Sequence, residues 1–345
     1  MKLFSNDLGV DLGTANVLIY VDGKGVVVRE PSVVALDKNT GKILEVGAAA
    51  RNMLGRTPGN VVAMHPLKGG VISDHEMTVR MLRELFREAC KTTLFTSKPR
   101  VIISVPSGVT EVEERTVISA AIEAGARRVY LIEQPLAAGL GAGLEISGPS
   151  GHMIVDIGGG TTDIAVLSLN GVAASSSIKV AGDTFDEAIG RYVRRQYGMV
   201  IGKTTAEDIK IRIGSVGKRT EEATMIVRGR NAQTSMAEVV ELHASEITEI
   251  LRRPARLIAD EVLSVMEDAS PELVSDISEN GITLTGGASQ LFGMDELLTE
   301  RTGIRCTLAD DPDSCVAFGC GKSLGWINKM AEGPINIARK RAMRS

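Results

Sequence analysis

The chain is poor in aromatic side chains and in histidine, and each shortage excludes a class of function. Aromatic residues make up 3% of the 345 residues, which argues against binding of single-stranded nucleic acid by base stacking. A net charge of −4 also argues against a nucleic-acid partner. The 4 histidines stand singly along the chain, so no metal site built on histidine is expected.

Other features that the sequence lacks indicate the cellular compartment of the protein. The 4 cysteines show no CxxC spacing, and the segment Met1–Asp7 is too short and too polar for a secretory signal. No apolar run reaches the roughly eighteen residues of a bilayer-spanning helix. We therefore expect a cytoplasmic protein with reduced thiols. Its length predicts two or more lobes rather than a single core.

The most informative feature that is present is a duplicated segment. Residues 10–20 (VDLGTANVLIY) and 155–166 (VDIGGGTTDIAV) each contain a short apolar strand, an aspartate, a Gly/Thr turn and a second apolar strand. Turns of this kind expose backbone N–H groups that bind phosphate oxygens, and glycine lets the backbone approach closely. Two such turns facing each other predict a clamp around a polyphosphate.

An aspartate, Asp11 or Asp156, ends the first strand of each copy. Two carboxylates that face a polyphosphate are unfavourable unless a hydrated Mg²⁺ lies between them and the phosphates. The alternative is that each aspartate only caps its own turn. The duplication favours a site for a nucleotide with Mg²⁺.

The rest of the chain alternates strands and helices in two similar halves. A capping box at Thr110 and Glu113 predicts a helix that ends at Gly125, and the run 139–143 is expected to permit close helix packing. Residues 198–240 are predicted to be irregular around one helix. Further helices are expected over 74–90, over 205–215, from about Ser245 with an interruption near Pro254, and over about 312–330.

These patterns predict an α/β protein of two lobes with a cleft between them. Lobe I is expected to comprise residues 1–147, with a small insertion at about 34–68. Lobe II is expected to comprise 148–330, with a second insertion at about 184–242 and a last helix that packs back on lobe I. Residues 331–345 form a basic tail.

The segments 11–14, 156–161 and 285–288 together resemble the nucleotide signature of the superfamily of actin, sugar kinases and heat-shock chaperone ATPases. A much longer collinear set resembles the bacterial actin family of MreB and Mbl over nearly the whole chain. The stretches that carry this resemblance are 9–16 (GVDLGTAN), 30–35 (EPSVVA), 55–59 (GRTPG), 70–72 (GVI), 132–133 (IE), 155–162 (VDIGGGTT), 181–183 (AGD), 185–189 (FDEAI), 205–210 (TAEDIK), 271–277 (PELVSDI) and 284–287 (LTGG).

The resemblance implies an actin-like fold, which is a duplicated ribonuclease H-like architecture with a nucleotide cleft and two small inserted subdomains. It also implies an ATP-dependent protein that forms filaments, with paired protofilaments. Such a filament lies on the inner face of the cytoplasmic membrane, organises cell-wall synthesis with membrane proteins of the elongation machinery, and maintains rod shape.

The same resemblance assigns site residues. Asp11 and Asp156 would bind Mg²⁺ through water, and Glu207 and Lys210, three apart on one helix face, would contact ribose and adenine. The phosphate-binding residues would be Gly13, Thr14, Ala15 and Asn16 from one lobe and Gly158, Gly159, Gly160 and Thr161 from the other. The remaining nucleotide contacts would involve Asp183, Asp208, Ile209, Gly286, Gly287, Ala288, Ser289 and Gln290.

Two positions depart from the family pattern. The family usually has Glu-Glu-Pro where this chain has Glu133-Gln134-Pro135, and the middle residue orients the attacking water. Glutamine positions water but cannot accept its proton, so we expect slow, filament-dependent ATP hydrolysis. Ala288 replaces the third glycine of its turn, which is expected to alter nucleotide affinity.

Four apolar residues are candidates for membrane contact. Leu3 and Phe4 lie at the N-terminus, and Leu94 and Phe95 are expected in a loop after a helix. A few inserted side chains bind weakly in one subunit and strongly in a filament. The alternative is that Leu94 and Phe95 pack in the core.

Three rival functions share the superfamily signature. A small-molecule kinase would need a catalytic aspartate beyond the nucleotide motifs, and no candidate is evident. A chaperone-type ATPase would normally continue into a peptide-binding domain. A plasmid-segregation actin should differ in the stretches 30–35 and 205–210.

Overall fold

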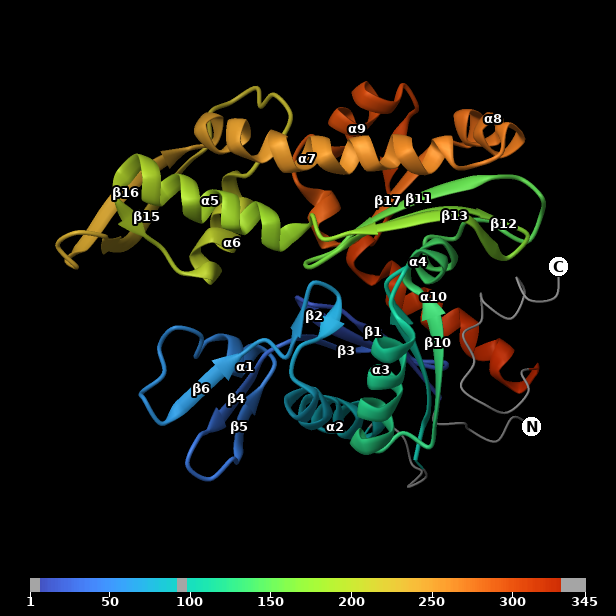
Figure 1. Cartoon of the computed structure of the whole chain (residues 1–345), viewed down its shortest axis with the longest axis horizontal. Coiled ribbons are helices and arrows are strands. Elements are labelled where there is room, and N and C mark those ends of the chain that lie inside the picture. Colours follow the sequence, from blue (N-terminus) through green and yellow to red (C-terminus); the bar gives the residue numbers. More distant parts are fainter. Residues whose placement is uncertain (1–6, 92–97, 330–345) are drawn as a thin grey trace.

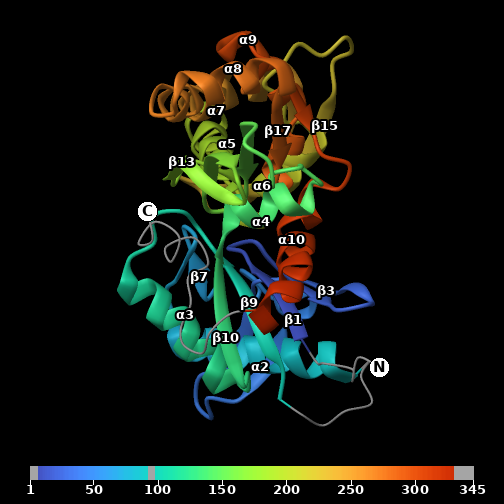
Figure 2. The same ribbon diagram turned by 90° about the vertical axis from the view of Figure 1, so that its right-hand side faces the viewer.

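The computed structural model describes residues 7–91 and 98–329, which form two lobes with one five-stranded sheet in each (Figures 1 and 2). The first sheet has the strand order β10-β9-β1-β2-β3 and the second β13-β12-β11-β17-β18. In both, the first strand of the duplicated segment pairs antiparallel with its hairpin partner and parallel with a later strand. The duplication in sequence is thus a duplication of sheet topology.

The first lobe carries one inserted three-stranded sheet, β5-β4-β6, which lies at its outer side (Figure 1). The elements of this half are β1 (Asp7–Leu12), β2 (Asn16–Val21), β3 (Gly25–Pro31), β4 (Val34–Asp37), β5 (Ile43–Val46), α1 (Ala48–Arg51), β6 (Val61–Met64), β7 (Leu67–Lys68), β8 (Val71–Ile72), α2 (His75–Lys91), β9 (Arg100–Val105), α3 (Glu111–Ala124), β10 (Arg128–Glu133) and α4 (Gln134–Gly141).

The second lobe carries the sheet β14-β15-β16 beside α5 and α6. The elements of this half are β11 (His152–Ile157), β12 (Thr162–Ser168), β13 (Gly171–Ile178), α5 (Gly182–Tyr197), β14 (Met199–Val200), α6 (Lys203–Ile213), β15 (Thr224–Asn231), β16 (Ala237–His243), α7 (Ala244–Glu267), α8 (Pro271–Asn280), β17 (Ile282–Thr285), η1 (Gly287–Gln290), α9 (Met294–Thr302), β18 (Cys306–Leu308), η2 (Pro312–Ser314), α10 (Cys315–Ser323) and η3 (Leu324–Lys329).

Local sequence signals explain several helix ends. Asp74 accepts a hydrogen bond from the backbone N–H of Met77 at 3.0 Å and so caps α2. The predicted capping box of Thr110 and Glu113 starts α3, and Gly125 ends it. These predictions are confirmed because capping uses contacts within a few residues and needs no tertiary partner.

The predicted interruption near Pro254 is wrong, because α7 runs unbroken from Ala244 to Glu267. Proline lacks the N–H that would bond to the carbonyl one turn earlier, which normally breaks a helix. Here Leu251, Pro254 and Ile258 are all buried against the core of the second lobe. This packing stabilises the helix on both sides of the proline.

The prediction of an irregular segment over 198–240 is also wrong. This region contains β15 and β16, which pair antiparallel over seven residue pairs. One face of the hairpin is buried through Val227 and Leu242, whereas Ile226 and Val239 are exposed. A strand with one buried face normally alternates apolar and polar residues in the sequence. In this hairpin the exposed face also carries apolar residues, so the alternation is hard to see.

The last predicted helix, 312–330, is an α-helix only in its centre, α10, with 3₁₀ turns η2 and η3 on either side. It packs against α4 and against β1 of the first sheet (Figure 2). A Cβ added to Gly141 would lie 1.7 Å from the Cys315 carbonyl oxygen, and one added to Gly319 would lie 1.7 Å from that of Ala137. Glycine is therefore required for this close helix contact, as predicted for the run 139–143.

The predicted membrane residues Leu3, Phe4, Leu94 and Phe95, and the tail 331–345, lie outside the described residues. Among the helices that the structure does describe, none combines the length and the apolarity that crossing a bilayer requires.

Candidate nucleotide site

The turns of the two duplicated hairpins touch each other across the boundary between the lobes. A Cβ added to Gly160 would lie 2.4 Å from Oγ1 of Thr14, and one added to Gly159 would lie 2.7 Å from Cβ of Ala15. The Thr14 hydroxyl also accepts a hydrogen bond from the backbone N–H of Gly70 at 2.9 Å. The two predicted phosphate loops are thus brought face to face.

These loops open onto a cavity of about 750 Å³ between the lobes. That volume lies within the usual range of ligand pockets, about 300–1,000 Å³. Most of the predicted site residues line it: Asp11, Gly13, Thr14, Ala15, Asn16, Gln134, Asp156, Gly158, Gly159, Gly160, Thr161, Glu207, Lys210, Gly286, Gly287, Ala288 and Gln290.

The carboxylate of Asp156 is 1% exposed and makes two short hydrogen bonds. Oδ1 accepts from the hydroxyl of Thr285 at 2.8 Å, and Oδ2 accepts from the amide of Gln134 at 2.7 Å. Burial raises the pKa of this carboxyl, and the two hydrogen bonds oppose that rise. The amide of Gln134 is therefore held by the aspartate that ends the hairpin strand.

Asp11 occupies the equivalent position in the first lobe. Its Oδ1 accepts one longer hydrogen bond, 3.2 Å, from the hydroxyl of Ser104. Burial and the negative charge of Asp156 raise the pKa of Asp11 to about 7. The two predicted metal-binding carboxylates thus face the same cavity and repel each other.

This pair of carboxylates suits a hydrated magnesium ion. In the described part of the chain no group of three or more His, Cys, Asp or Glu side chains is arranged to hold a metal ion directly. Mg²⁺ keeps several waters and is typically held by one or two carboxylates together with substrate phosphates. Asp11 and Asp156, which line the cavity together with the two predicted phosphate loops, provide such a set.

Helix α6 places Glu207 and Lys210 on the cavity side. Glu207 pairs with Arg51 of α1 at 2.5 Å, so this contact joins the insertions of the two lobes. Lys210 pairs with Asp186 at 2.8 Å and donates to the carbonyl of Gly182 at 3.2 Å. Both residues are positioned by ionic contacts with neighbouring elements.

Four predicted contact residues do not line the cavity. Ile209 is fully buried in the core of the second lobe, because its side chain points about 100° around α6 from that of Lys210. Ser289 is also fully buried and donates to the carbonyl of Gly286 at 2.6 Å. Asp183 and Asp208 are exposed outside the cavity.

Several cavity residues were not predicted from the sequence. Arg219 lies over the ring of Phe292, with its guanidinium carbon 4.6 Å from the ring centroid. Arg29 and Asp313 line the cavity from β3 and η2. No spacing marks these four residues, because tertiary contacts between distant segments bring them to the site.

A further carboxylate, the fully buried Asp163 of β12, also joins the lobes. Its Oδ1 accepts a hydrogen bond from the backbone N–H of Ser107, in the segment after β9, at 2.9 Å. Burial and the charge of Asp156 raise the pKa of Asp163 to about 7. The interface between the lobes thus contains a group that titrates near neutral pH.

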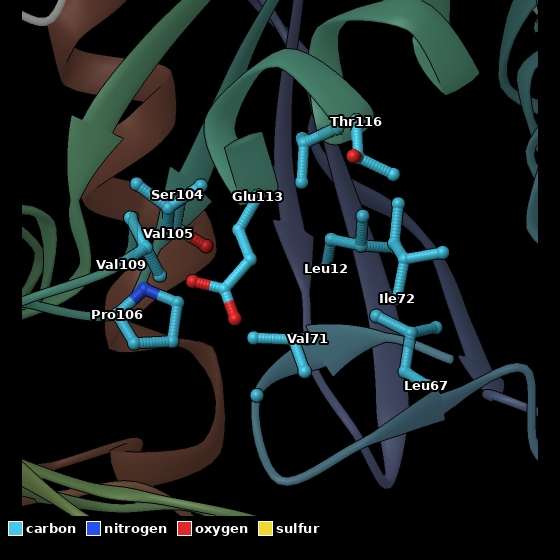
Figure 3. Close-up of a pocket in the computed structure, with 12 residues that line it drawn as sticks. Leu12, Leu67, Val71, Ile72, Ser104, Val105, Pro106, Val109, Glu113 and Thr116 are labelled. Atoms are coloured by element: carbon cyan, nitrogen blue, oxygen red, sulfur yellow. The ribbon is translucent and has the colours of Figure 1, made fainter. Parts of the chain in front are cut away.

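A second, smaller pocket lies between the start of α3 and the β7–β8 hairpin (Figure 3). Leu12, Val71 and Val109 are among the apolar residues around it, and the carboxylate of Glu113 lies at its centre in the view. Its volume of about 40 Å³ accommodates a few water molecules and no nucleotide. The larger cavity is therefore the candidate site.

Solved structures of other proteins share this architecture. MreB5 of Spiroplasma citri bound to ADP superimposes with a TM-score of 0.88 at 38% identity, covering 93% of this chain and 97% of that chain. The same protein bound to AMPPNP gives a TM-score of 0.87. A MamK double helical filament gives 0.76 at 22% identity, over 92% of this chain and 98% of that one, which supports the fold alone. The predicted actin-like α/β fold is confirmed.

Curated relatives match over nearly their whole length. Cell shape-determining protein Mbl of Bacillus cereus is 48% identical over 330 residues, which cover 95% of this chain and 98% of the relative. Cell shape-determining protein MreB of Escherichia coli (strain K12) is 49% identical over 330 residues, which cover 94% and 95%. The family described as MreB/Mbl protein matches residues 5–332. The chain belongs to the MreB/Mbl family.

Proposed function

We propose that the chain binds ATP and ADP with Mg²⁺ in the cavity between its lobes, and that nucleotide binding governs assembly into filaments. The observation that carries this proposal is the contact between the two hairpin turns, which line one cavity together with Asp11 and Asp156. Related structures bound to AMPPNP and ADP support it. The phosphates would lie against the backbone N–H groups of 13–16 and 158–161.

The hydrolytic step depends on Gln134 in this proposal. Its amide N–H donates to Asp156, so the side-chain carbonyl is the atom that can accept a hydrogen bond from the attacking water. Glutamine orients water without removing a proton from it, and hydrolysis should be slow. Mg²⁺, held through water by Asp11 and Asp156, would neutralise phosphate charge.

The cellular role follows from family membership. Relatives are cell shape-determining proteins, and a structural neighbour is a double helical filament. We propose that this chain forms paired protofilaments on the inner face of the cytoplasmic membrane, in contact with membrane proteins of cell-wall elongation. Leu3, Phe4, Leu94 and Phe95 are the proposed membrane residues.

The first test is sedimentation of purified protein with Mg-ATP, with Mg-ADP or without nucleotide, in the presence and absence of anionic liposomes. We expect nucleotide-dependent filaments in electron micrographs of the pellet, bound to the liposomes. A protein that binds ATP tightly and stays monomeric under every condition would contradict the filament function. Liposome binding at wild-type levels by a Leu3/Phe4/Leu94/Phe95→Ser variant would contradict the membrane assignment.

The second test concerns Gln134. We expect Gln134→Ala to lower the rate of phosphate release by up to about a hundredfold, the loss that misplacement of a reacting group by about 1 Å can cause. Its affinity for ATP should stay near the wild-type value, because the two loops are intact. Unchanged phosphate release would remove Gln134 from the mechanism.

A further inference from the structure

Arg29 stands beside the first phosphate loop although it is distant from it in sequence. In the β2–β3 pairing its Cα partner is Leu18, and both residues line the cavity. Leu18 lies two residues after the loop residue Asn16. Because of this strand register, the side chain of Arg29 lies at the edge of the cavity, close in the sheet to the first predicted phosphate loop.

Three basic side chains line the cavity in the part of the chain that the structure describes: Arg29, Lys210 and Arg219. Lys210 is held by Asp186 at 2.8 Å, and both side chains are largely buried. Arg219 lies over the Phe292 ring and donates to the carbonyl of Gly214 at 3.0 Å. Two of the three cations are thus held by contacts within the second lobe.

Arg29 makes looser ionic contacts. Its guanidinium lies 3.7 Å from a carboxylate oxygen of Asp311 and 3.8 Å from one of Asp313, and it donates a hydrogen bond to the hydroxyl of Ser314. All three ionic side chains are about half exposed. Exposed ion pairs of this kind contribute little to stability, so leaving the two carboxylates is inexpensive. The hydrogen bond to Ser314, which is fully buried, is the contact that Arg29 must exchange for a bond to phosphate.

The acidic partners of Arg29 lie beside the third glycine turn of the site. The carbonyl of Pro312 accepts from the N–H of Gly286 at 2.9 Å, and a Cβ on Gly287 would lie 2.7 Å from Oδ1 of Asp313. Arg29 thus reaches from β3 of the first lobe to the segment 311–314, with the cavity beside it. The two predicted phosphate loops line this same cavity.

We infer that Arg29 is a phosphate-binding residue of this chain, which leaves the acidic segment 311–314 and binds the diphosphate of ADP or ATP when nucleotide enters. A phosphate accepts two parallel guanidinium N–H bonds, which are stronger than an exposed ion pair at 3.7 Å. Asp11 and Asp156 bring negative charge to the same cavity, so a cation at its edge also lowers the repulsion of the polyphosphate. This inference rests on the proposed nucleotide-binding function.

The test compares the affinities of Arg29→Gln and wild type for ADP, AMP and adenosine, each with Mg²⁺, by titration calorimetry. We expect Arg29→Gln to weaken ADP binding about tenfold or more, since a lost charge-assisted bond is typically about 1.5–3 kcal/mol. Adenosine binding should be unchanged. A loss of AMP affinity in the variant would show that Arg29 contacts the first phosphate, whereas unchanged AMP affinity would show that it contacts the second. ADP affinity should also depend less steeply on salt in the variant.

Two further variants separate charge from structure. Arg29→Lys keeps the charge and should recover part of the lost ADP affinity. Arg228→Gln makes the same charge change at an exposed position of β15 outside the cavity and should bind ADP like wild type. Melting temperatures of all variants check that each protein is folded.

Two results would overturn the inference. One is wild-type ADP affinity in Arg29→Gln, and the other is an equal loss for ADP and adenosine. Absence of any nucleotide binding by the wild-type protein would instead contradict the proposed function, so the two failures are distinguishable.

Discussion

The two duplicated hairpins have the same topology, but their turns differ in the residues that they tolerate. In the first lobe the turn is Gly13-Thr14-Ala15-Asn16, whereas in the second it contains Gly158, Gly159 and Gly160 in succession. Side chains of the first turn fill the space in front of the second, where an added Cβ would meet Thr14 or Ala15. Gly159 and Gly160 of the second copy are thus explained by the side chains of the first.

The aspartates of the two hairpins also differ, in how firmly hydrogen bonds hold their carboxylates. Asp156 is held by Thr285 and Gln134 at 2.8 and 2.7 Å, whereas Asp11 has the hydroxyl of Ser104 at 3.2 Å. The second carboxylate is therefore more rigidly oriented than the first. If both hold Mg²⁺ through water, Asp156 is the fixed side of the site.

The largest effect is expected from Gly160→Ala. Its Cβ would lie 2.4 Å from Thr14 Oγ1 and 3.0 Å from the backbone nitrogen of Gly70, so the two turns must separate. Overpacking of this kind costs about 1–3 kcal/mol, and we expect ADP affinity to fall about tenfold or more. Calorimetric titration and urea unfolding measure both quantities.

Gly158→Ala is the matched control, because its Cβ would meet one backbone atom, the carbonyl oxygen of Thr161, at 3.2 Å. We expect it to lose less ADP affinity than Gly160→Ala. Equal losses for the two variants would mean that contact between the turns does not determine the glycine requirement.

The next comparison concerns the hydrogen bonds that hold the two aspartates. Thr285→Val removes a 2.8 Å bond to a buried carboxylate and should lower the free energy of unfolding by about 1.5–3 kcal/mol. Ser104→Ala removes the 3.2 Å bond to Asp11 and should cost about 1 kcal/mol or less. Urea unfolding at pH 8 without nucleotide compares them. A larger loss for Ser104→Ala would reverse the proposed order of rigidity.

The last comparison concerns pH and Asp163. The pKa of this carboxyl is about 7 in the folded protein, above its ordinary value of 3.8, so the folded state binds a proton that the unfolded state releases. Its contribution to stability therefore falls as pH rises from about 4 to about 7, and it is constant above that range.

Asp163→Asn keeps an oxygen that can accept from Ser107 and removes the charge. Without nucleotide or Mg²⁺, we expect the stability that the variant gains over wild type to be larger at pH 8 than at pH 5. Melting temperatures at the two values measure this. The same difference at both pH values would show that Asp163 does not titrate in this range.

Local signals in the sequence were sufficient for much of the fold. The caps at Asp74 and Thr110 and the hairpin strands depend on neighbouring residues, and their predictions are confirmed. Pro254 and the β15–β16 hairpin were misjudged, because burial against the second lobe outweighs a weak local pattern in both.

The sequence alone determined that two glycine-containing turns follow equivalent strands and that Asp11 and Asp156 occupy equivalent positions, because a repeated motif of strand, aspartate and glycine turn is visible along the chain. Only the tertiary structure decided which face of α6 lines the cavity, why Gly160 must be glycine, and that Arg29 and Asp313 share an edge of the site. The physical reason is that each of these depends on contacts between segments far apart in the chain, which the packing of two lobes creates and no local pattern records.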